Sequence, residues 1–188
     1  MPYTEKFEDA LVYAAKLHRD QTRKGTGVPY VTHLLAVAAI VGENGGTEDE
    51  VISALLHDAP EDAGGEERLA EIRTRFGDEV ANVVAGCTDT YERAKPPWRA
   101  RKEAYLDHLG GAPPSVRLVS AADKLHNARS VLSDSRAVGD ELWARFNGGR
   151  AGTLWYYRAV ADALAHDGPV ADELGRVVAV LERAAEGG

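Results

Sequence analysis

Apolar residues recur at helical spacing through almost all of this chain of 188 residues. Phe7, Leu11 and Ala14 stand at positions i, i+4 and i+7 and therefore share one helix face. His18 continues the same face at i+11. No stretch alternates apolar and polar residues over the length of a β-strand. The pattern predicts an all-α protein of about eight to ten short helices.

The first two predicted helices have recognisable ends. The first apolar stripe predicts a helix over about residues 5–20. A second helix is expected to begin near Thr32 or His33 and to stop at Gly45-Gly46, where glycine can adopt the left-handed cap conformation.

A capping box is predicted at the start of the third helix, with Thr47 as N-cap and Glu50 three residues later. Pro60 should end this helix close to Ala59. Further helices are predicted over 66–76, 78–87, 98–109 and 114–132, with two or three more between 139 and 185. Loops are expected near 21–31, 60–66, 89–97 and 133–139.

The charge balance excludes one class of function. The chain carries 30 acidic and 22 basic side chains, a formal net charge of −8, which argues against a nucleic-acid-binding protein held by a general positive field. The single cysteine, Cys87, cannot form an internal disulfide, and no apolar run approaches the roughly 20 residues of a membrane span. We expect a cytoplasmic protein with no nucleic-acid or membrane partner, folded as one domain over residues 1–188.

The clearest candidate for a functional site is His57-Asp58, which follows a segment that is apolar nearly all round. A helix over Val51–Leu56 has to be buried, so the two polar side chains at its end are brought into or beside the core. A buried carboxylate needs a metal ion, a base or a dense hydrogen-bond network. For this dipeptide alone, a helix cap beside a packed histidine ring is the alternative.

Two further residues would complete a metal site. His33 is expected in the first turn of a helix after a Pro-Tyr pair, and Asp123 lies among apolar residues of a later predicted helix. With His57 and Asp58 they form a mixed set of nitrogen and oxygen ligands, which suits Mn²⁺, Fe²⁺ or Zn²⁺. Mg²⁺ and Ca²⁺ prefer shells of oxygen alone. A six-coordinate ion would keep open positions for water and substrate, as hydrolysis requires.

Two acids, Glu61 and Asp62, follow shortly after this pair. Carboxylates near a metal-bound water are where a general base or a water-orienting group is expected. A solvated acidic turn is the alternative for the pair taken alone.

Basic residues stand next to these candidates in an otherwise acidic chain. Arg23 and Lys24 lie in the glycine-containing segment before His33, and Lys124 and Arg129 lie close to Asp123. Guanidinium and ammonium groups bind phosphate oxygens, so their placement favours an anionic substrate. Each basic side chain taken alone fits a solvated surface position better, and only their placement together favours the anionic substrate.

Taken together, these residues resemble the HD superfamily of metal-dependent phosphohydrolases, whose signature is H…HD…D on helices. The signature here is His33, His57-Asp58 and Asp123. The resemblance implies an all-α HD-domain fold over the chain. It also implies that these four residues bind one Mn²⁺, with Fe²⁺ and Zn²⁺ as the alternatives.

Longer segments extend the resemblance to the hydrolase domain of RelA/SpoT-type enzymes, which remove the 3′-pyrophosphate from the guanosine alarmones ppGpp and pppGpp. The chain is similar in length to the stand-alone small alarmone hydrolases, including the metazoan SpoT-like one. The segments that carry this resemblance are QTRKGTGVPYVTH, ALLHDAPED, IRTRFGDEV, VVAGCTD and LVSAADKLHNARSVL.

This resemblance implies roles for further residues. Glu61 and Asp62 become the pair that activates the attacking water, and Arg23 and Lys24 line the nucleotide pocket. The other implied substrate contacts are Asn127, Lys124, Arg129 and Tyr157.

One departure from the family pattern lies at the acidic pair. The family commonly has two aliphatic residues before the pair and a threonine after it, whereas this chain has Ala59-Pro60 before it and Ala63-Gly64-Gly65 after it. The departure affects the local loop geometry and the relative roles of Glu61 and Asp62, while every acid and ligand is present.

Two alternatives to alarmone hydrolysis stay open. One is an HD phosphohydrolase for another nucleotide, such as the 2′-phosphate of NADPH or a nucleoside mono- or triphosphate, because HD domains host many substrates. The other is a nucleotide-sensing or antitoxin-like binding module without turnover. A homodimer is possible, since symmetric dimers are common among soluble proteins.

Overall fold

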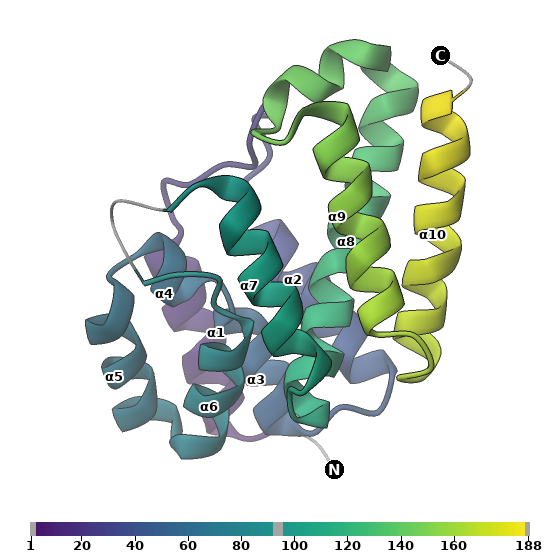
Figure 1. Ribbon diagram of the computed structural model, residues 1–188. Coiled ribbons are helices and arrows are strands. Elements are labelled where there is room, and N and C mark those ends of the chain that lie inside the picture. Colours follow the sequence, from purple (N-terminus) through teal and green to yellow (C-terminus); the bar gives the residue numbers. More distant parts are fainter. Residues whose placement is uncertain (1–2, 92–95, 187–188) are drawn as a thin grey trace. The chain divides into compact units, whose positions relative to one another are not determined.

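The computed structural model describes residues 3–91 and 96–186, and over these residues it is all-α, as expected (Figure 1). The chain divides into two compact units, residues 1–95 and 96–188. The helices of the first unit are α1 (Glu5–Leu17), α2 (Val31–Glu43), α3 (Glu48–Leu56), α4 (Ala59–Asp62), α5 (Gly65–Phe76) and α6 (Asp78–Cys87). Those of the second are α7 (Trp98–Gly110), α8 (Pro114–Val138), the 3₁₀ helix η1 (Gly139–Arg145), α9 (Gly149–Ala163) and α10 (Pro169–Glu186).

Helix α3 is the centre of the first unit. All six residues of Val51–Leu56 are buried, and α3 packs against α1, α2 and α6. Because each apolar face of α3 meets a different neighbour, burial stabilises the helix on every side. The expectation that this segment is buried is confirmed, and the helix delivers His57 and Asp58 from the core.

The predicted end of α2 and the predicted start of α3 are also confirmed. Helix α2 ends in a Schellman motif, in which Gly46 N donates to Val41 O at 3.0 Å and Gly45, at φ +82°, donates to Gly42 O at 3.1 Å. The Thr47 side chain accepts from Glu50 N, and the Glu50 carboxylate accepts from Thr47 N at 2.7 Å. The capping box therefore fixes where α3 begins.

The segment around Pro60 differs from the prediction of a helix end followed by a loop over 60–66. Helix α3 stops at Leu56, and Pro60 lies in the first turn of the separate short helix α4. The first turn of a helix has no intrahelical partner for its N–H groups, so proline is tolerated there. Helix α5 then begins at Gly65, inside the expected loop.

The loop before α2 is closed by backbone pairing. An isolated antiparallel bridge joins Thr22 and Pro29, Arg23 N donates to Val28 O at 2.8 Å, and Tyr30 N donates to Gln21 O at 2.9 Å. The residues at the two ends of the loop are thereby held side by side.

Helix α8 organises the second unit. It packs against α10, α9 and η1, and its buried side chains include Val119, Leu125 and Val131. The loop expected over 133–139 is wrong, because α8 continues to Val138 and the chain turns only at Gly139, at φ +59°. No proline or glycine interrupts the segment before Gly139, so nothing stops the helix earlier.

Part of the loop expected over 89–97 lies outside the described residues. Among the helices that the structure describes, none is both long enough and apolar enough to cross a membrane.

Candidate metal centre

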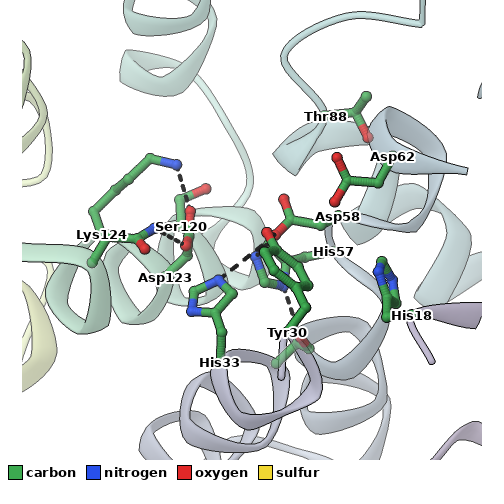
Figure 2. Close-up of polar contacts among 12 residues, drawn as sticks. His18, Tyr30, His33, His57, Asp58, Asp62, Thr88, Ser120, Asp123 and Lys124 are labelled. Carbon is green, nitrogen blue, oxygen red and sulfur yellow. Dashed lines mark hydrogen bonds and ion pairs between the residues drawn. The ribbon is translucent and has the colours of Figure 1, made fainter. Parts of the chain in front are cut away.

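Three side chains of the first unit meet at one point, His33 from α2 and the pair His57-Asp58 that follows α3 (Figure 2). One ligand atom of each lies within 4.8 Å of the others. The Nε2 atoms of His57 and His33 lie 3.0 and 3.6 Å from Asp58 Oδ2. Both rings are buried, and Asp58 is partly exposed. The predicted convergence of these three residues is therefore present in the structure.

The tautomer of His57 is determined by the end of α3. The His57 Nδ1 atom lies 2.8 Å from the carbonyl oxygen of Ala54, and a carbonyl only accepts hydrogen bonds. Nδ1 therefore carries the proton in the neutral ring, and Nε2 presents its lone pair toward Asp58. The carbonyls of the last helical turn lack intrahelical donors, so a histidine directly after α3 fits this position.

Asp58 is oriented by a tyrosine at the end of the 21–30 loop. The Tyr30 hydroxyl donates a hydrogen bond of 2.6 Å to Asp58 Oδ2. The Tyr30 ring also stacks on His18, with centroids 5.3 Å apart and planes inclined by 28°. Asp58 is thus held by a second layer of side chains, as metal ligands commonly are.

The acidic pair lies on the short helix α4, directly after Asp58. Asp62 N donates to Asp58 O at 3.0 Å, so the first turn of this helix ties the candidate base to the candidate ligand. Part of the Asp62 side chain is exposed, yet burial of its carboxyl group away from water raises its pKa. The negative charge of Asp58 raises that pKa further. A hydrogen bond of 2.8 Å from Gln21 Nε2 opposes that rise in pKa.

The first-unit cluster suits a divalent cation. Two imidazole nitrogens and a carboxylate oxygen within 4.8 Å are the ligand types that a borderline ion such as Mn²⁺, Fe²⁺ or Zn²⁺ accepts. The Nδ1–H tautomer of His57 leaves the right nitrogen for coordination. The residues present therefore fit the metal that the sequence predicts.

The second unit holds Asp123 in a polar group of its own on α8. Asp123 is 5% exposed, its Oδ1 accepts from Asn127 Nδ2 at 2.5 Å, and its Oδ2 pairs with Lys124 Nζ. Burial lowers the pKa of Lys124, but the negative charge of Asp123, its hydrogen bond with Lys124 and the nearby Tyr156 and Tyr105 together outweigh burial and hold that pKa well above its usual value. The Lys124 ammonium also lies 5.4 Å from the centroid of the Tyr105 ring.

The remaining predicted substrate contacts have different surroundings. Arg23 and Lys24 lie in the closed loop whose ends contact Asp62 through Gln21 and Asp58 through Tyr30. Arg129 is exposed and pairs with Glu173 at 3.3 Å. Tyr157 is buried in α9, at 7% exposure.

Three residues of the site were not singled out from the sequence, namely His18, Gln21 and Tyr30. His18 stands on the apolar face of α1 and is 2% exposed. A polar residue that continues an apolar stripe is the signal that could have drawn attention to it. Gln21 and Tyr30 carried no such signal, because their partners lie far away in sequence.

The sequence is similar to several known proteins. The sequence model of the HD domain family matches residues 10–154. The guanosine-3′,5′-bis(diphosphate) 3′-pyrophosphohydrolase MESH1 of Homo sapiens is 36% identical over 126 residues, which cover 65% of this chain and 68% of that protein. The longer guanosine-3′,5′-bis(diphosphate) 3′-pyrophosphohydrolase of Aquifex aeolicus is 33% identical over 129 residues, 69% of this chain but only 18% of that protein.

Solved structures share the fold. A metazoan ortholog of SpoT, described as hydrolysing ppGpp, aligns with a TM-score of 0.78 and 24% identity over 97% of both chains. A crystal structure of a Listeria monocytogenes protein aligns with a TM-score of 0.71 and 32% identity, covering 80% of this chain and 99% of that one.

Proposed function

This chain belongs to the HD domain family, and on that premise we propose that it hydrolyses the 3′-pyrophosphate of guanosine alarmones. The products would be pyrophosphate and GDP from ppGpp, or GTP from pppGpp. The observation that carries the proposal is the cluster of His33, His57 and Asp58 with an acidic pair on the next helical turn. The similarity to relatives that bear this activity in their names supports the choice of substrate.

The proposed cofactor is Mn²⁺, with Fe²⁺ and Zn²⁺ as alternatives, held by His33, His57, Asp58 and Asp123. The ligand types of the first three support a borderline divalent ion. The assignment of Asp123 rests on the family motif, and its burial on α8 is compatible with a ligand. When bound, the ion acts as a Lewis acid that lowers the pKa of water and neutralises charge on phosphoryl oxygens.

The acidic pair is proposed to prepare the attacking water. Asp62 or Glu61 accepts a proton from that water while the water oxygen attacks the phosphorus nearest the ribose 3′ oxygen. The bond between this phosphorus and the 3′ oxygen breaks, and the 3′ oxygen leaves with the electron pair and takes up a proton. The raised pKa of Asp62 brings its basicity closer to neutral pH, which favours a proton acceptor.

The proposed substrate contacts are ranked by their surroundings. Arg23 and Lys24 stand on a loop anchored at the metal centre, which supports a role in binding phosphate oxygens. Lys124 and Asn127 both contact Asp123, so we propose that they bind the nucleotide next to Asp123. Arg129 and Tyr157 stay proposals from the family resemblance.

Domain organisation and assembly complete the proposal. We propose that residues 1–188 form one HD-type domain, because the family match includes residues of both compact units. The proposed binding partner is a small nucleotide, and the proposed compartment is the cytoplasm. The proposed assembly is a homodimer.

The decisive experiment measures pyrophosphate release from ppGpp by the Mn²⁺-loaded protein, with NADPH, GTP and dGTP in parallel and Asp58→Ala as a control. Release from ppGpp that requires the metal and is lost in Asp58→Ala is the expected result. Turnover of another nucleotide instead would identify a different HD phosphohydrolase. Binding of ppGpp without turnover of any substrate would identify a sensing module.

A further inference from the structure

His18 and Gln21 connect two parts of the candidate site that the proposed function uses separately. Gln21 contacts the acid Asp62, and His18 contacts both Gln21 and the tyrosine that donates to Asp58. We infer that His18 and Gln21 are positioning residues, which hold Asp62 and, through Tyr30, Asp58 in place for the proposed hydrolysis. This inference rests on the proposed function.

The direction of each hydrogen bond follows from the chemistry of the groups. An ionised Asp62 only accepts, so the Gln21 atom at 2.8 Å from its Oδ2 is the donating Nε2. The other end of the amide, Oε1, lies 2.6 Å from His18 Nδ1 and accepts from it. A flipped amide would set its carbonyl oxygen against the carboxylate, so this orientation is the favourable one.

The buried ring of His18 agrees with that direction. Its Nε2 atom is buried and has no hydrogen-bond partner among the residues that the structure describes. A proton on Nε2 would therefore be a buried donor without an acceptor, which is unfavourable. The neutral ring is most stable with its proton on Nδ1, where Gln21 accepts it.

The backbone holds both positioning contacts at one place. His18 is the C-cap of α1, and its own N–H donates to Ala14 O. Gln21 N donates to His18 O at 3.1 Å, and Gln21 O accepts from Tyr30 N at 2.9 Å. Because Gln21 and Tyr30 are paired through their backbones, the side chains that reach Asp62 and Asp58 keep a fixed spacing.

The two contacts predict two separable effects. Gln21 acts on Asp62, one of the two proposed proton acceptors, so its loss should lower kcat and leave KM and metal affinity unchanged. The His18 ring supports Tyr30 and, through it, a metal ligand, so loss of the ring should weaken metal binding. Groups that orient catalytic or ligating side chains typically contribute about 10–100-fold.

The first test compares Gln21→Met with Asn82→Met as a matched control. Asn82 is an exposed amide of the same unit that accepts a hydrogen bond from Arg73, so its loss removes a similar contact away from the site. We expect Gln21→Met to lower kcat for ppGpp about 10–100-fold with KM within about twofold, and Asn82→Met to change neither. In an Asp62→Asn background, Gln21→Met should cause no further loss, because the residue it positions is already disabled. Wild-type kcat in Gln21→Met, or an equal loss in both backgrounds, would overturn the assignment of Gln21.

The second test does not depend on turnover. Calorimetric titration with Mn²⁺ is expected to give about 10-fold weaker binding for His18→Ala and for Tyr30→Phe. His18→Phe keeps a ring against Tyr30 and should bind Mn²⁺ like the wild type, while its kcat falls as in Gln21→Met. Unchanged affinity in His18→Ala, with the fold intact by circular dichroism, would overturn the assignment of His18. If wild-type protein bound Mn²⁺ but released no pyrophosphate from ppGpp, the proposed function would fail, and this series would still decide whether His18 supports the ligand.

Discussion

The Nδ1 atom of His57 lies 2.8 Å from the carbonyl oxygen of Ala54, one turn back along α3. This contact fixes which nitrogen faces Asp58, and it uses a carbonyl that the end of a helix leaves without a donor. The ligand geometry is thus prepared by the way α3 ends.

Asp58→Ala should abolish both metal binding and turnover, because it removes the carboxylate that both histidine rings face. We expect Mn²⁺ affinity to fall by more than the roughly 10–100-fold that is typical when only a supporting residue is lost. Calorimetric titration measures this change. Asp78→Ala, which removes an exposed carboxylate bonded to Arg73, serves as the control and should keep wild-type affinity.

Glu61→Gln and Asp62→Asn should keep the metal and lose rate. A general base contributes typically about 10²–10⁴-fold, so the residue that accepts the proton should lose kcat by that factor. The hydrogen bond from Gln21 and the raised pKa make Asp62 the stronger candidate. Steady-state kinetics on both variants with measured metal content will tell the two acids apart. Near-normal kcat in both would refute the role of the pair.

Lys124→Met should destabilise the metal-free protein, because it leaves the buried carboxylate of Asp123 without its ammonium partner. Removing one member of a buried ion pair costs roughly 3 kcal/mol. Urea unfolding of the metal-free variant measures the loss. A change below about 0.5 kcal/mol would show that the pair contributes as little as an exposed one.

Two glycine substitutions should have opposite signs. Gly45→Ala forces a side chain into the positive-φ position of the Schellman motif, which costs about 1 kcal/mol. Gly175 lies inside α10, where a new Cβ would meet nothing within 4 Å, so Gly175→Ala should stabilise by about 0.5–1 kcal/mol. Thermal melts should shift by about 2–4 °C in each direction. Equal shifts of one sign would contradict the backbone argument.

Glu182 should contribute stability that depends on pH. The hydrogen bond from Arg158 is the main cause that lowers the pKa of Glu182 in the folded state. A lowered pKa means that the stability is present above the unfolded value of about 4.3 and is lost as pH falls through the folded value. Because both side chains are about one-third exposed, at 38% and 30%, the contribution should be no more than about 1 kcal/mol.

Urea unfolding of wild type and Glu182→Gln at pH 7 and pH 3 checks this linkage. The variant should be less stable at pH 7, and the difference should narrow at pH 3. A difference that grew on acidification would contradict the assigned sign.

Much of the fold was predictable because its signals are local. The capping box at Thr47 and the glycine cap at Gly45 each involve a few neighbouring residues, and both are found where the sequence predicts them. The all-α class and the burial of Val51–Leu56 follow from periodicity alone.

The errors arise where one residue type serves two purposes. Proline breaks a helix interior but is suited to a first turn, so Pro60 alone did not distinguish the end of α3 from the start of α4. The loop predicted over 133–139 has a different cause. The last residues of α8 before Gly139 are mostly polar and exposed, so no apolar periodicity marks them as helical, and only the absence of a helix-breaking residue does.

The candidate site shows the same division. His33, His57 and Asp58 could be selected because His33 stands in the first turn of an apolar helix and the pair His57-Asp58 follows the last turn of another. The supporting contacts of Gln21 and Tyr30 join residues 41 and 28 positions apart, and only the folded chain brings these residues together.

The bridge between Thr22 and Pro29 separates the tip of its loop from the loop's ends. Gln21 and Tyr30, outside the bridge, contact Asp62 and Asp58, whereas Arg23 and Lys24 lie within the bridged segment. The segment between Thr22 and Pro29 can therefore change in length, charge or sequence while the bridge keeps Gln21 and Tyr30 at a fixed spacing. If Arg23 and Lys24 bind the nucleotide, as proposed, new segments grafted between Thr22 and Pro29 would change the nucleotide specificity, while Gln21 and Tyr30 keep their contacts with Asp62 and Asp58.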